Sequence, residues 1–437
     1  MQCRLGAVSH EALRYQSGLG NTFETEALVG TLPRIQNSPR RLPHGLYAEQ
    51  INGTGFTVER ALNQRTWVYR LRPQVLDQAF VPRASGRFAG RFDQGVSSPQ
   101  LRRYRPPSVP SASTDFLAGL TTFAGAGDPC IRRGMAIHLY AANEDMTGVF
   151  ADVDGDLLIA PELGRLRLET ELGRIDVGPT ELAVVPRGLR FRVRLLDAQA
   201  RGFVAEVFDA HLQLPERGPV GANGLADARH FEVPLAWFED VSTATLIVVK
   251  QGGALYEVTS PHSPFDVVAW HGNYAPYKYD LTKFTSLGSV SWDHPDPSLL
   301  TVLTCPADTH GRNALDVAVF QRRWDVSEGT FRPPYFHRNS AVEFNAVLSS
   351  ADTEGPWQAG AFSFTPYLSP HGVGAQTVVD AASDSDAPER ISERSVWLQL
   401  ESTYSLRLMP WMLDHPAVDA DYLASFSGYP AGTSSRR

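Results

Sequence analysis

The sequence predicts an all-β fold made of two jelly-roll or β-sandwich units, with irregular N-terminal segments that wrap around them. Between residues 134 and 215, short apolar stretches are separated by glycine turns at intervals of roughly nine residues. Residues 165–169 alternate polar and apolar side chains, as a half-buried strand does. A second series of apolar stretches, including 298–304 and 314–320, follows residue 281. Regular short strands joined by glycine turns are typical of sandwiches and jelly rolls.

The N-terminal segments are rich in loop-forming residues. From Glu11 to about residue 75 the chain carries many Gly, Pro and Asn residues and only short apolar bursts, which predicts irregular strands and loops around a core. Residues 83–113 are rich in Arg, Pro and Ser and show little periodicity. We expect this stretch to be a long surface connection, with Arg102 and Arg103 in a solvated loop.

The N-terminal unit carries a motif of a β-barrel without a metal. Residues 178–188 resemble the second motif of a cupin, in which a glycine turn and a strand precede Pro-x-Gly. A metal-binding cupin has a histidine just beyond this motif, whereas Leu189-Arg-Phe191 follows here. We therefore expect a bicupin. Residues 1–280 form an N-terminal domain with a metal-free cupin-like β-sandwich, and residues 281–437 form a C-terminal cupin domain that carries the metal site.

The acidic stretch from Asp152 to Asp156 invites comparison with a calcium loop. An EF-hand loop beginning at Asp152 would need Gly at position 157 and Glu at position 163, but Leu157 and Leu163 stand there. The sequence therefore predicts a hairpin turn instead of a calcium site.

Composition and charge narrow the class of protein. The chain has 437 residues, of which 43% are hydrophobic, enough for a sizeable core. Its net charge of -8 argues against nucleic acid as a partner, because such proteins present a basic face. The first residues contain no long apolar run, and no stretch of about 18 apolar residues occurs, so we expect a cytoplasmic protein without a membrane partner. The three cysteines, which show no Cys-x-x-Cys pairing, suit a reducing compartment.

Two side chains of the kind that bind metals stand six residues apart, His337 and Glu343. Neither a straight strand nor a helix would bring both to one ion, but residues 338–340 have turn chemistry, and a bend could do so. His371, in a Pro-His-Gly corner, is the candidate third ligand. Two histidines and one carboxylate form the facial triad of non-haem Fe(II) oxygenases, which leaves positions open for O2 and a substrate. The alternative is that His337 is an ordinary surface histidine and Glu343 a solvated charge.

Longer motifs around these residues resemble the homogentisate 1,2-dioxygenase family, from Tyr15 to about residue 411. Six motifs of five to nine residues occur in the same order as in the family, which makes the resemblance specific. They are YQSGLGN at 15–21, GLYAEQ at 45–50, GPVGANGLA at 218–226, VAWHGNY at 268–274, DHPDP at 293–297 and FRPPY at 331–335.

The resemblance implies a set of iron ligands and a reaction. The family's ligands fall on His337, Glu343 and His371, and its acid/base histidine near the substrate falls on His294. The implied cofactor is Fe(II), and the implied reaction converts homogentisate and O2 to maleylacetoacetate in tyrosine and phenylalanine breakdown. The family also implies a homo-oligomer, a hexamer built as a dimer of trimers.

The resemblance further implies substrate contacts at Tyr335, Thr365 and His371, but the chain departs from the family close to the iron. The family has a histidine at the position of Thr365, six residues before the third ligand. After Glu343 it reads Met-Gly and then an Arg-Gly-x-Tyr word, where this chain has Asn345-Ala346 and then a stretch that ends at Asp352.

Three functions follow from this pattern. The first is the cleavage of homogentisate. The second is a related dioxygenase that opens a different dihydroxylated ring, for example in a biosynthetic pathway, and the departures at Thr365 and Asp352 favour it. The third, a non-enzymatic bicupin that binds or stores a ligand, would be indicated by a broken triad, whereas the triad here is intact.

Overall fold

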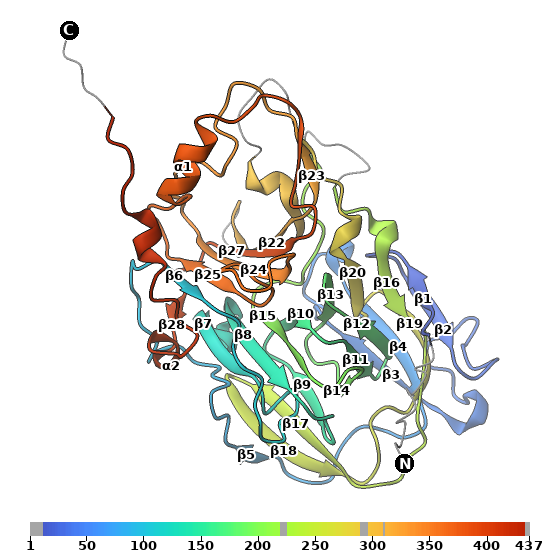
Figure 1. The fold of residues 1–437 in the computed structure, drawn as a ribbon. Coiled ribbons are helices and arrows are strands. Elements are labelled where there is room, and N and C mark those ends of the chain that lie inside the picture. Colours follow the sequence, from blue (N-terminus) through green and yellow to red (C-terminus); the bar gives the residue numbers. More distant parts are fainter. Residues whose placement is uncertain (1–11, 219–224, 289–295, 309–310, 433–437) are drawn as a thin grey trace, which may run out of the picture.

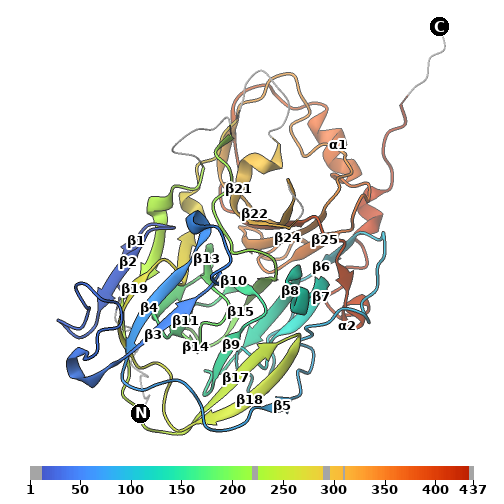
Figure 2. The ribbon, with the colours of Figure 1, turned by 180° about the vertical axis from the view of Figure 1, so that it is seen from behind.

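The computed structural model describes residues 12–218, 225–288, 296–308 and 311–432 (Figures 1 and 2). The predicted all-β class is confirmed, because the described chain consists mainly of strands, with two α-helices and several short 3-10 helices. No helix in these ranges is both long and apolar enough to cross a membrane. The helical elements are α1 (Ala375–Ala381), α2 (Pro410–Leu413), η1 (Pro43–Gly45), η2 (Arg60–Leu62), η3 (Pro129–Ile131), η5 (Ala228–His230), η6 (Leu281–Lys283), η7 (Pro297–Leu300) and η8 (Leu423–Phe426).

Two large sheets form the N-terminal sandwich. The nine-stranded sheet runs in the order β1 (Tyr15–Ser17), β16 (Phe231–Pro234), β20 (Tyr277–Asp280), β13 (Glu181–Val185), β10 (Asp156–Leu163), β15 (Ala200–Val207), β8 (Arg133–Ala142), β7 (Thr121–Asp128) and β28 (Arg407–Leu408). The seven-stranded sheet runs in the order β12 (Gly173–Val177), β11 (Leu166–Thr170), β14 (Phe191–Leu195), β9 (Val149–Asp152), β17 (Thr245–Gln251), β18 (Ala254–Ser260) and β5 (Val81–Arg83).

The N-terminal wrapping segments contribute to a smaller sheet beside this sandwich. Three of its four strands come from the first 70 residues, and the fourth comes from residues 267–272. Its order is β2 (Phe23–Glu26), β19 (Val267–Gly272), β4 (Arg65–Arg70) and β3 (Tyr47–Asn52).

The C-terminal unit is built on one six-stranded antiparallel sheet. Its order is β21 (Thr301–Pro306), β22 (Asn313–Phe320), β27 (Val396–Ser402), β24 (Val342–Ser349), β25 (Phe362–Thr365) and β6 (Arg102–Tyr104). A separate two-stranded sheet pairs β23 (Arg323–Asp325) with β26 (Glu389–Ile391).

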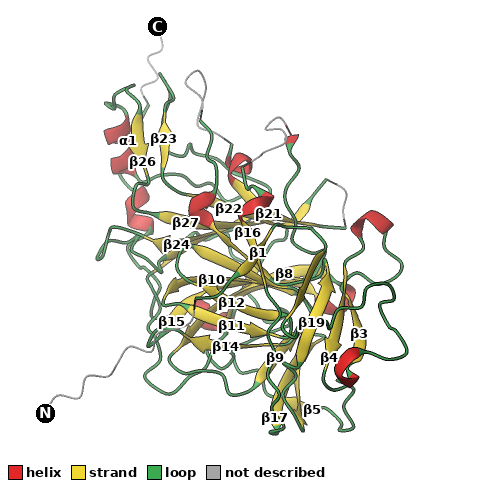
Figure 3. Ribbon diagram, turned by 90° about the vertical axis from the view of Figure 1, so that its right-hand side faces the viewer, coloured by secondary structure: helices red, strands yellow, loops and turns green. Residues whose placement is uncertain are grey.

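The six-stranded, nine-stranded and seven-stranded sheets lie one above the other, as Figure 3 shows. Aromatic side chains fill the space between the first two. Phe344 of β24 lies 5.3 Å from Phe123 of β7 and 5.6 Å from Phe203 of β15, measured between ring centroids. All three side chains are buried. The two units therefore share one hydrophobic core, which fixes the C-terminal sheet against the sandwich.

One strand that was expected to be half-buried is buried on both faces. In β11, Arg167 and Glu169 are each 8% exposed. Arg167 pairs with Asp176 at 2.7 Å, and Glu169 pairs with Arg192. The polar face of the strand is thus covered by ion pairs, which the alternation of residue types alone does not reveal.

The expectation for residues 83–113 was wrong in its central part. Arg102–Tyr104 forms β6 and pairs with β25, at the edge of the C-terminal sheet. Arg103 is 8% exposed, is paired with Asp419 at 2.8 Å and lies over the ring of Tyr422. This central part therefore belongs to the folded sheet. The opposite charge of Asp419 and the aromatic ring of Tyr422 stabilise the buried guanidinium of Arg103.

Candidate metal centre

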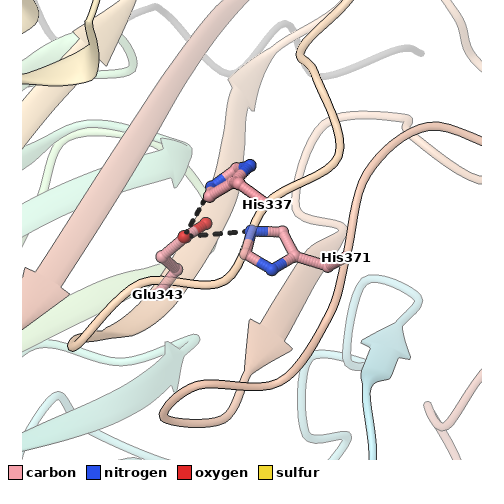
Figure 4. A group of neighbouring side chains, drawn as sticks. All are labelled: His337, Glu343 and His371. Atoms are coloured by element: carbon pink, nitrogen blue, oxygen red, sulfur yellow. Dashed lines mark ion pairs between the residues drawn. The ribbon is translucent and has the colours of Figure 1, made fainter.

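The three predicted ligands come together at one end of the C-terminal sheet (Figure 4). Glu343 is the second residue of β24, and its side chain is buried. His337 and His371 lie on the loops before β24 and after β25, where they form an isolated antiparallel bridge. The backbone N–H of each histidine donates to the carbonyl oxygen of the other, at 3.0 and 3.1 Å. The predicted bend is therefore present, and this bridge holds the two histidines side by side.

The side chains of the cluster converge on one carboxylate oxygen. Oε1 of Glu343 lies 3.0 Å from Nε2 of His371 and 3.5 Å from Nε2 of His337. One ligand atom from each residue lies within 4.8 Å of the other two. A single ion could therefore contact all three side chains.

The other ring nitrogen of each histidine faces the backbone. Nδ1 of His337 lies 2.9 Å from the carbonyl oxygen of Tyr335, and Nδ1 of His371 lies 3.0 Å from that of Ser369. A carbonyl only accepts hydrogen bonds, so each Nδ1 carries the proton and donates it. Each Nε2 then presents its lone pair to the centre of the cluster, the orientation that a metal-binding imidazole has.

The donor set fits a divalent metal ion. Nε2 of His371 is buried and has no hydrogen-bond partner among the described residues, although it lies close to Glu343. Within the same part of the chain, no lysine or arginine forms an ion pair with Glu343. Two imidazole nitrogens and one carboxylate are the ligands of facial metal sites. The residues present thus leave a place for a cation that the described side chains do not fill.

The pKa values of His337 and Glu343 show that the buried carboxylate is stabilised by positive charge nearby. The nearby carboxylate of Glu343 raises the pKa of His337 above its ordinary value. Burial raises the pKa of Glu343, but the side chains of His337 and His371 close to its carboxylate outweigh burial and hold this pKa well below the usual range. A proton on an imidazole and a metal ion are alternative ways to balance the buried carboxylate.

Sequence reasoning missed two side chains behind the ligand carboxylate. Nδ2 of Asn339 donates to Oε1 of Glu343 at 2.6 Å and to Oε1 of Glu401 at 3.3 Å. Glu401 stands directly across from Glu343 on β27. Burial, with the negative charges of Glu343 and Asp316, raises the pKa of Glu401 to about 7. Strand alternation within 396–401 could have placed this glutamate on a polar face, but its partner strand was not evident from the sequence.

The predicted substrate contacts lie beside the cluster. The ring of Tyr335 meets the ring of His337 edge-on, with 5.4 Å between centroids. Thr365 is buried and pairs directly with Glu343 across β25 and β24. Asp352 is exposed beyond the far end of β24. The predicted acid/base residue His294 lies outside the described residues.

A hollow of about 510 Å³ borders the histidine-bearing loops. Its lining is mostly apolar, and the C-terminal segment supplies part of it. The hydroxyl of Tyr429 donates to the carbonyl oxygen of Val373 at 2.6 Å, and its ring meets that of Phe336. The lining residues are Leu101, Phe336, His337, Arg338, Pro370, His371, Gly372, Phe426 and Tyr429.

A second carboxylate cluster lies in the N-terminal sandwich and contains its own cation. Ligand atoms of Asp152, Asp154 and Glu206 lie within 4.8 Å of one another, and all three residues are buried. Nζ of Lys250 contacts Glu206 and lies 3.1 Å from Asp154 and 3.6 Å from Asp152. The predicted hairpin after Asp152 was wrong, because β9 and β10 belong to different sheets. The acidic turn instead brings its carboxylates to a lysine from a distant strand.

The fold and the first cluster together define an all-β bicupin with a two-histidine, one-carboxylate centre at the end of its C-terminal sheet. Two family models cover the chain. One, described as homogentisate 1,2-dioxygenase N-terminal, matches residues 14–281, and the other, homogentisate 1,2-dioxygenase C-terminal, matches residues 282–432. The chain belongs to the homogentisate 1,2-dioxygenase family, which implies an enzyme with a metal cofactor.

Curated relatives agree with this assignment over almost the whole chain. Homogentisate 1,2-dioxygenase of Arabidopsis thaliana is 46% identical over 433 residues, which are 96% of this chain and 93% of the relative. The enzyme of the same name from Oryza sativa subsp. japonica is 48% identical over 429 residues, 95% of this chain and 91% of the relative.

Solved structures show a more distant likeness. A cupin 2 conserved barrel domain protein from Leptotrichia buccalis has a TM-score of 0.30 and 10% identity, and covers 67% of this chain and 92% of that chain. A mutant of Bacillus subtilis oxalate decarboxylase has a TM-score of 0.26 and 12% identity, and covers 70% and 82%.

Proposed function

We propose that this chain is a ring-cleaving dioxygenase that converts homogentisate and O2 to maleylacetoacetate. The observation that carries the proposal is the identity of 46% and 48% to two curated homogentisate 1,2-dioxygenases over nearly their full length. The cluster of His337, Glu343 and His371 supports it, because its donor set is that of non-haem iron oxygenases.

The proposed cofactor is Fe(II), held by His337, Glu343 and His371. Bound there, the ion would lower the pKa of a phenolic hydroxyl and carry charge between the electron-rich ring and O2, chemistry that side chains do not supply. The chain's own contribution is orientation. The carbonyl oxygens of Tyr335 and Ser369 fix the tautomers of the two histidines, and Asn339 holds the carboxylate of Glu343.

The proposed substrate contacts are Tyr335, Thr365 and His371. Tyr335 is 41% exposed and packs edge-on against His337, so its ring can border an aromatic substrate beside the cluster. Thr365 offers a hydroxyl beside Glu343, whereas an imidazole would offer a group that titrates near neutral pH.

His294 is the proposed acid/base residue. Ring opening needs a group that accepts a phenolic proton when the substrate binds and returns a proton later, and an imidazole suits both steps. We expect His294→Ala to lose most of its turnover and to keep its iron. Loss of iron as complete as in a Glu343 variant would instead make His294 a ligand or a structural support. Turnover near that of the wild type would exclude it from proton transfer.

We further propose that residues 1–280 and 281–437 form the two domains, and that the chain is a cytoplasmic homo-oligomer, a dimer of trimers. A subunit interface would account for the strong exposure of the apolar side chains of Val29, Ile35 and Val75 in the wrapping segments. Cys130 and Cys305 are free thiols, which suits a reducing compartment. Light scattering of the purified protein measures the number of subunits.

Oxygen uptake by iron-loaded protein tests the proposed function. We expect saturable uptake with homogentisate and formation of maleylacetoacetate with a stoichiometry of one O2 per ring. Gentisate and unsubstituted hydroquinone serve as comparison substrates. Faster uptake with another dihydroxylated ring would favour the related dioxygenase, which the presence of Thr365 directly opposite Glu343 keeps as the second candidate.

A further inference from the structure

The six-stranded sheet has one apolar and one polar face. Residues that pair directly across neighbouring strands point to the same side of a sheet. The row that contains Phe344 is apolar and packs against the N-terminal sandwich. The opposite face points toward the loops that carry α1 and β23 (Figure 1). Its polar members are Arg103, Thr304, Asp316, Glu343, Asn345, Ser363, Thr365, Gln399 and Glu401.

These side chains form two parallel rows. The first contains the ligand Glu343, with Thr365 on one side and Glu401 on the other. The second contains Asn345, with Ser363 and Gln399 as its direct neighbours. Asn345 follows Glu343 by two residues on the same strand, so the rows are about 6.7 Å apart. A single aromatic ring can therefore span the distance from the carboxylate of the metal centre to the second row.

The two rows differ in their hydrogen bonds. In the first, Glu401 accepts from Asn339 and the neighbouring Asp316 accepts from Asn313 at 2.9 Å, while the side chain of Thr365 forms no hydrogen bond with any described residue. In the second, the side chains of Asn345 and Ser363 form no hydrogen bond with any described residue. Oε1 of Gln399 is buried without a hydrogen-bond partner among the residues that the structure describes, and Gln399 is only 5% exposed. In the second row, therefore, all three side chains retain unused hydrogen-bonding capacity.

A buried polar group without a partner is unfavourable by about 1–3 kcal/mol, so we expect a ligand to supply the partner of Oε1 of Gln399, beside the half-buried Asn345. The three side chains are neutral and can both donate and accept. Three carboxyl groups, of Glu343, Glu401 and Asp316, lie in the adjacent row. Arg103 continues the second row beyond Ser363, but its charge is paired with Asp419 at 2.8 Å. A carboxylate bound beside Asn345 would be repelled by the three carboxyl groups, whereas a hydroxyl would not.

We propose that Asn345, with Ser363 and Gln399, binds the ring hydroxyl of the dihydroxylated substrate that is not held at the metal centre. This inference rests on the proposed function, and it makes Asn345 a specificity-determining residue of the same site. The row would favour rings with two hydroxyl groups over rings with one. The acid arm of the substrate would lie elsewhere.

The test measures binding without turnover. Iron-loaded protein is titrated by calorimetry in the absence of O2 with three compounds. Homogentisate carries both hydroxyls and the acid arm, hydroquinone carries both hydroxyls only, and 2-hydroxyphenylacetate carries one hydroxyl and the arm. The variants are Asn345→Leu and Gln399→Met, and Gln376→Met on the exposed side of α1 is the control. Metal content and melting temperature show whether each variant is folded and loaded.

We expect Asn345→Leu to raise the Kd of homogentisate and of hydroquinone about tenfold, the effect of one hydrogen bond, and to change the Kd of 2-hydroxyphenylacetate less than twofold. Gln399→Met should act in the same direction, and Gln376→Met should change none of the three. Weakening confined to homogentisate and 2-hydroxyphenylacetate would overturn the proposal, because the row would then bind the acid arm. Equal weakening of all three compounds, or no weakening, would overturn it as well.

Failure of the proposed function is a separate result. Suppose that Asn345→Leu weakens the binding of hydroquinone and homogentisate as expected, but that the wild type consumes no O2 with homogentisate. The hydroxyl-binding role of Asn345 would then be supported, and the proposed reaction would be wrong.

Discussion

The two carboxylate clusters of this protein solve the same electrostatic problem in different ways. In the N-terminal sandwich, Asp152, Asp154 and Glu206 surround Nζ of Lys250, and all four residues are buried. In the C-terminal unit, Glu343 faces two histidines, and no lysine or arginine among the described residues pairs with it. Buried carboxylates need a nearby cation. The first cluster contains its own ammonium group and is a structural element, which we call the closed cluster. The second contains none and is free to take a metal ion, and we call it the open cluster.

The largest effect is expected at the open cluster. Glu343→Ala removes the anionic ligand of the proposed site, so bound iron should be lost. Turnover should fall by more than the roughly 10–100-fold that follows when a residue hydrogen-bonded to a metal ligand is replaced. Metal analysis and oxygen uptake measure both. Glu354→Ala, at an exposed glutamate of the same region, is the control and should retain iron and activity. A Glu343 variant with a full complement of iron would refute the ligand assignment.

The closed cluster should respond in stability instead of activity. Lys250→Met leaves buried carboxylates without their cation, which should lower the free energy of unfolding by about 3–5 kcal/mol. Urea denaturation measures the change, and Lys283→Met, whose side chain is 41% exposed, is the control. Wild-type stability in the Lys250 variant would mean that the cluster carries less negative charge than its geometry indicates.

The closed cluster should also make stability depend on pH. Burial, with the charge of Lys250, lowers the pKa of His138 to about 3, whereas the unfolded chain has a value near 6.5. Between these values only the unfolded state binds the proton, so this contribution is complete above pH 6.5 and is lost as the pH falls toward 3. At pH 5 the loss is about 2 kcal/mol.

Comparison with His138→Gln isolates this contribution from other acidic groups. Chemical denaturation at pH 7 and pH 5 should show a smaller loss in the variant than in the wild type. Equal losses would place the proton uptake on another residue.

The smallest effect is expected at Asp152. Burial and the charge of Glu206 raise the pKa of this carboxyl well above its ordinary value, which favours its neutral form. Oδ1 accepts from the backbone N–H of Asp154 and Gly155, and an amide oxygen can do the same. Asp152→Asn should therefore change the free energy of unfolding by less than about 1 kcal/mol. A loss as large as that of Lys250→Met would show that Asp152 is ionised.

The sequence predicted the open cluster better than the closed one. His337 and Glu343 are close in the chain, and the turn between them and the family's motifs led to His371, as the bridge between the histidines now explains. Lys250 and Glu206 stand on strands far from the acidic turn, and no local pattern joins them. The fold class followed from strand spacing. The position of β6 did not, because it depends on pairing with a strand that lies in the other half of the chain.

The exchange of edge strands ties the two halves of the protein together during its synthesis. β6 (Arg102–Tyr104) is synthesised long before its partner β25. β28 (Arg407–Leu408), near the end of the chain, pairs with β7 at the edge of the nine-stranded sheet. A nascent or truncated chain therefore exposes an unpaired edge in each direction, and such edges recruit other strands. A C-terminal fragment that begins near residue 281 would lack β6, and we expect it to aggregate when expressed alone.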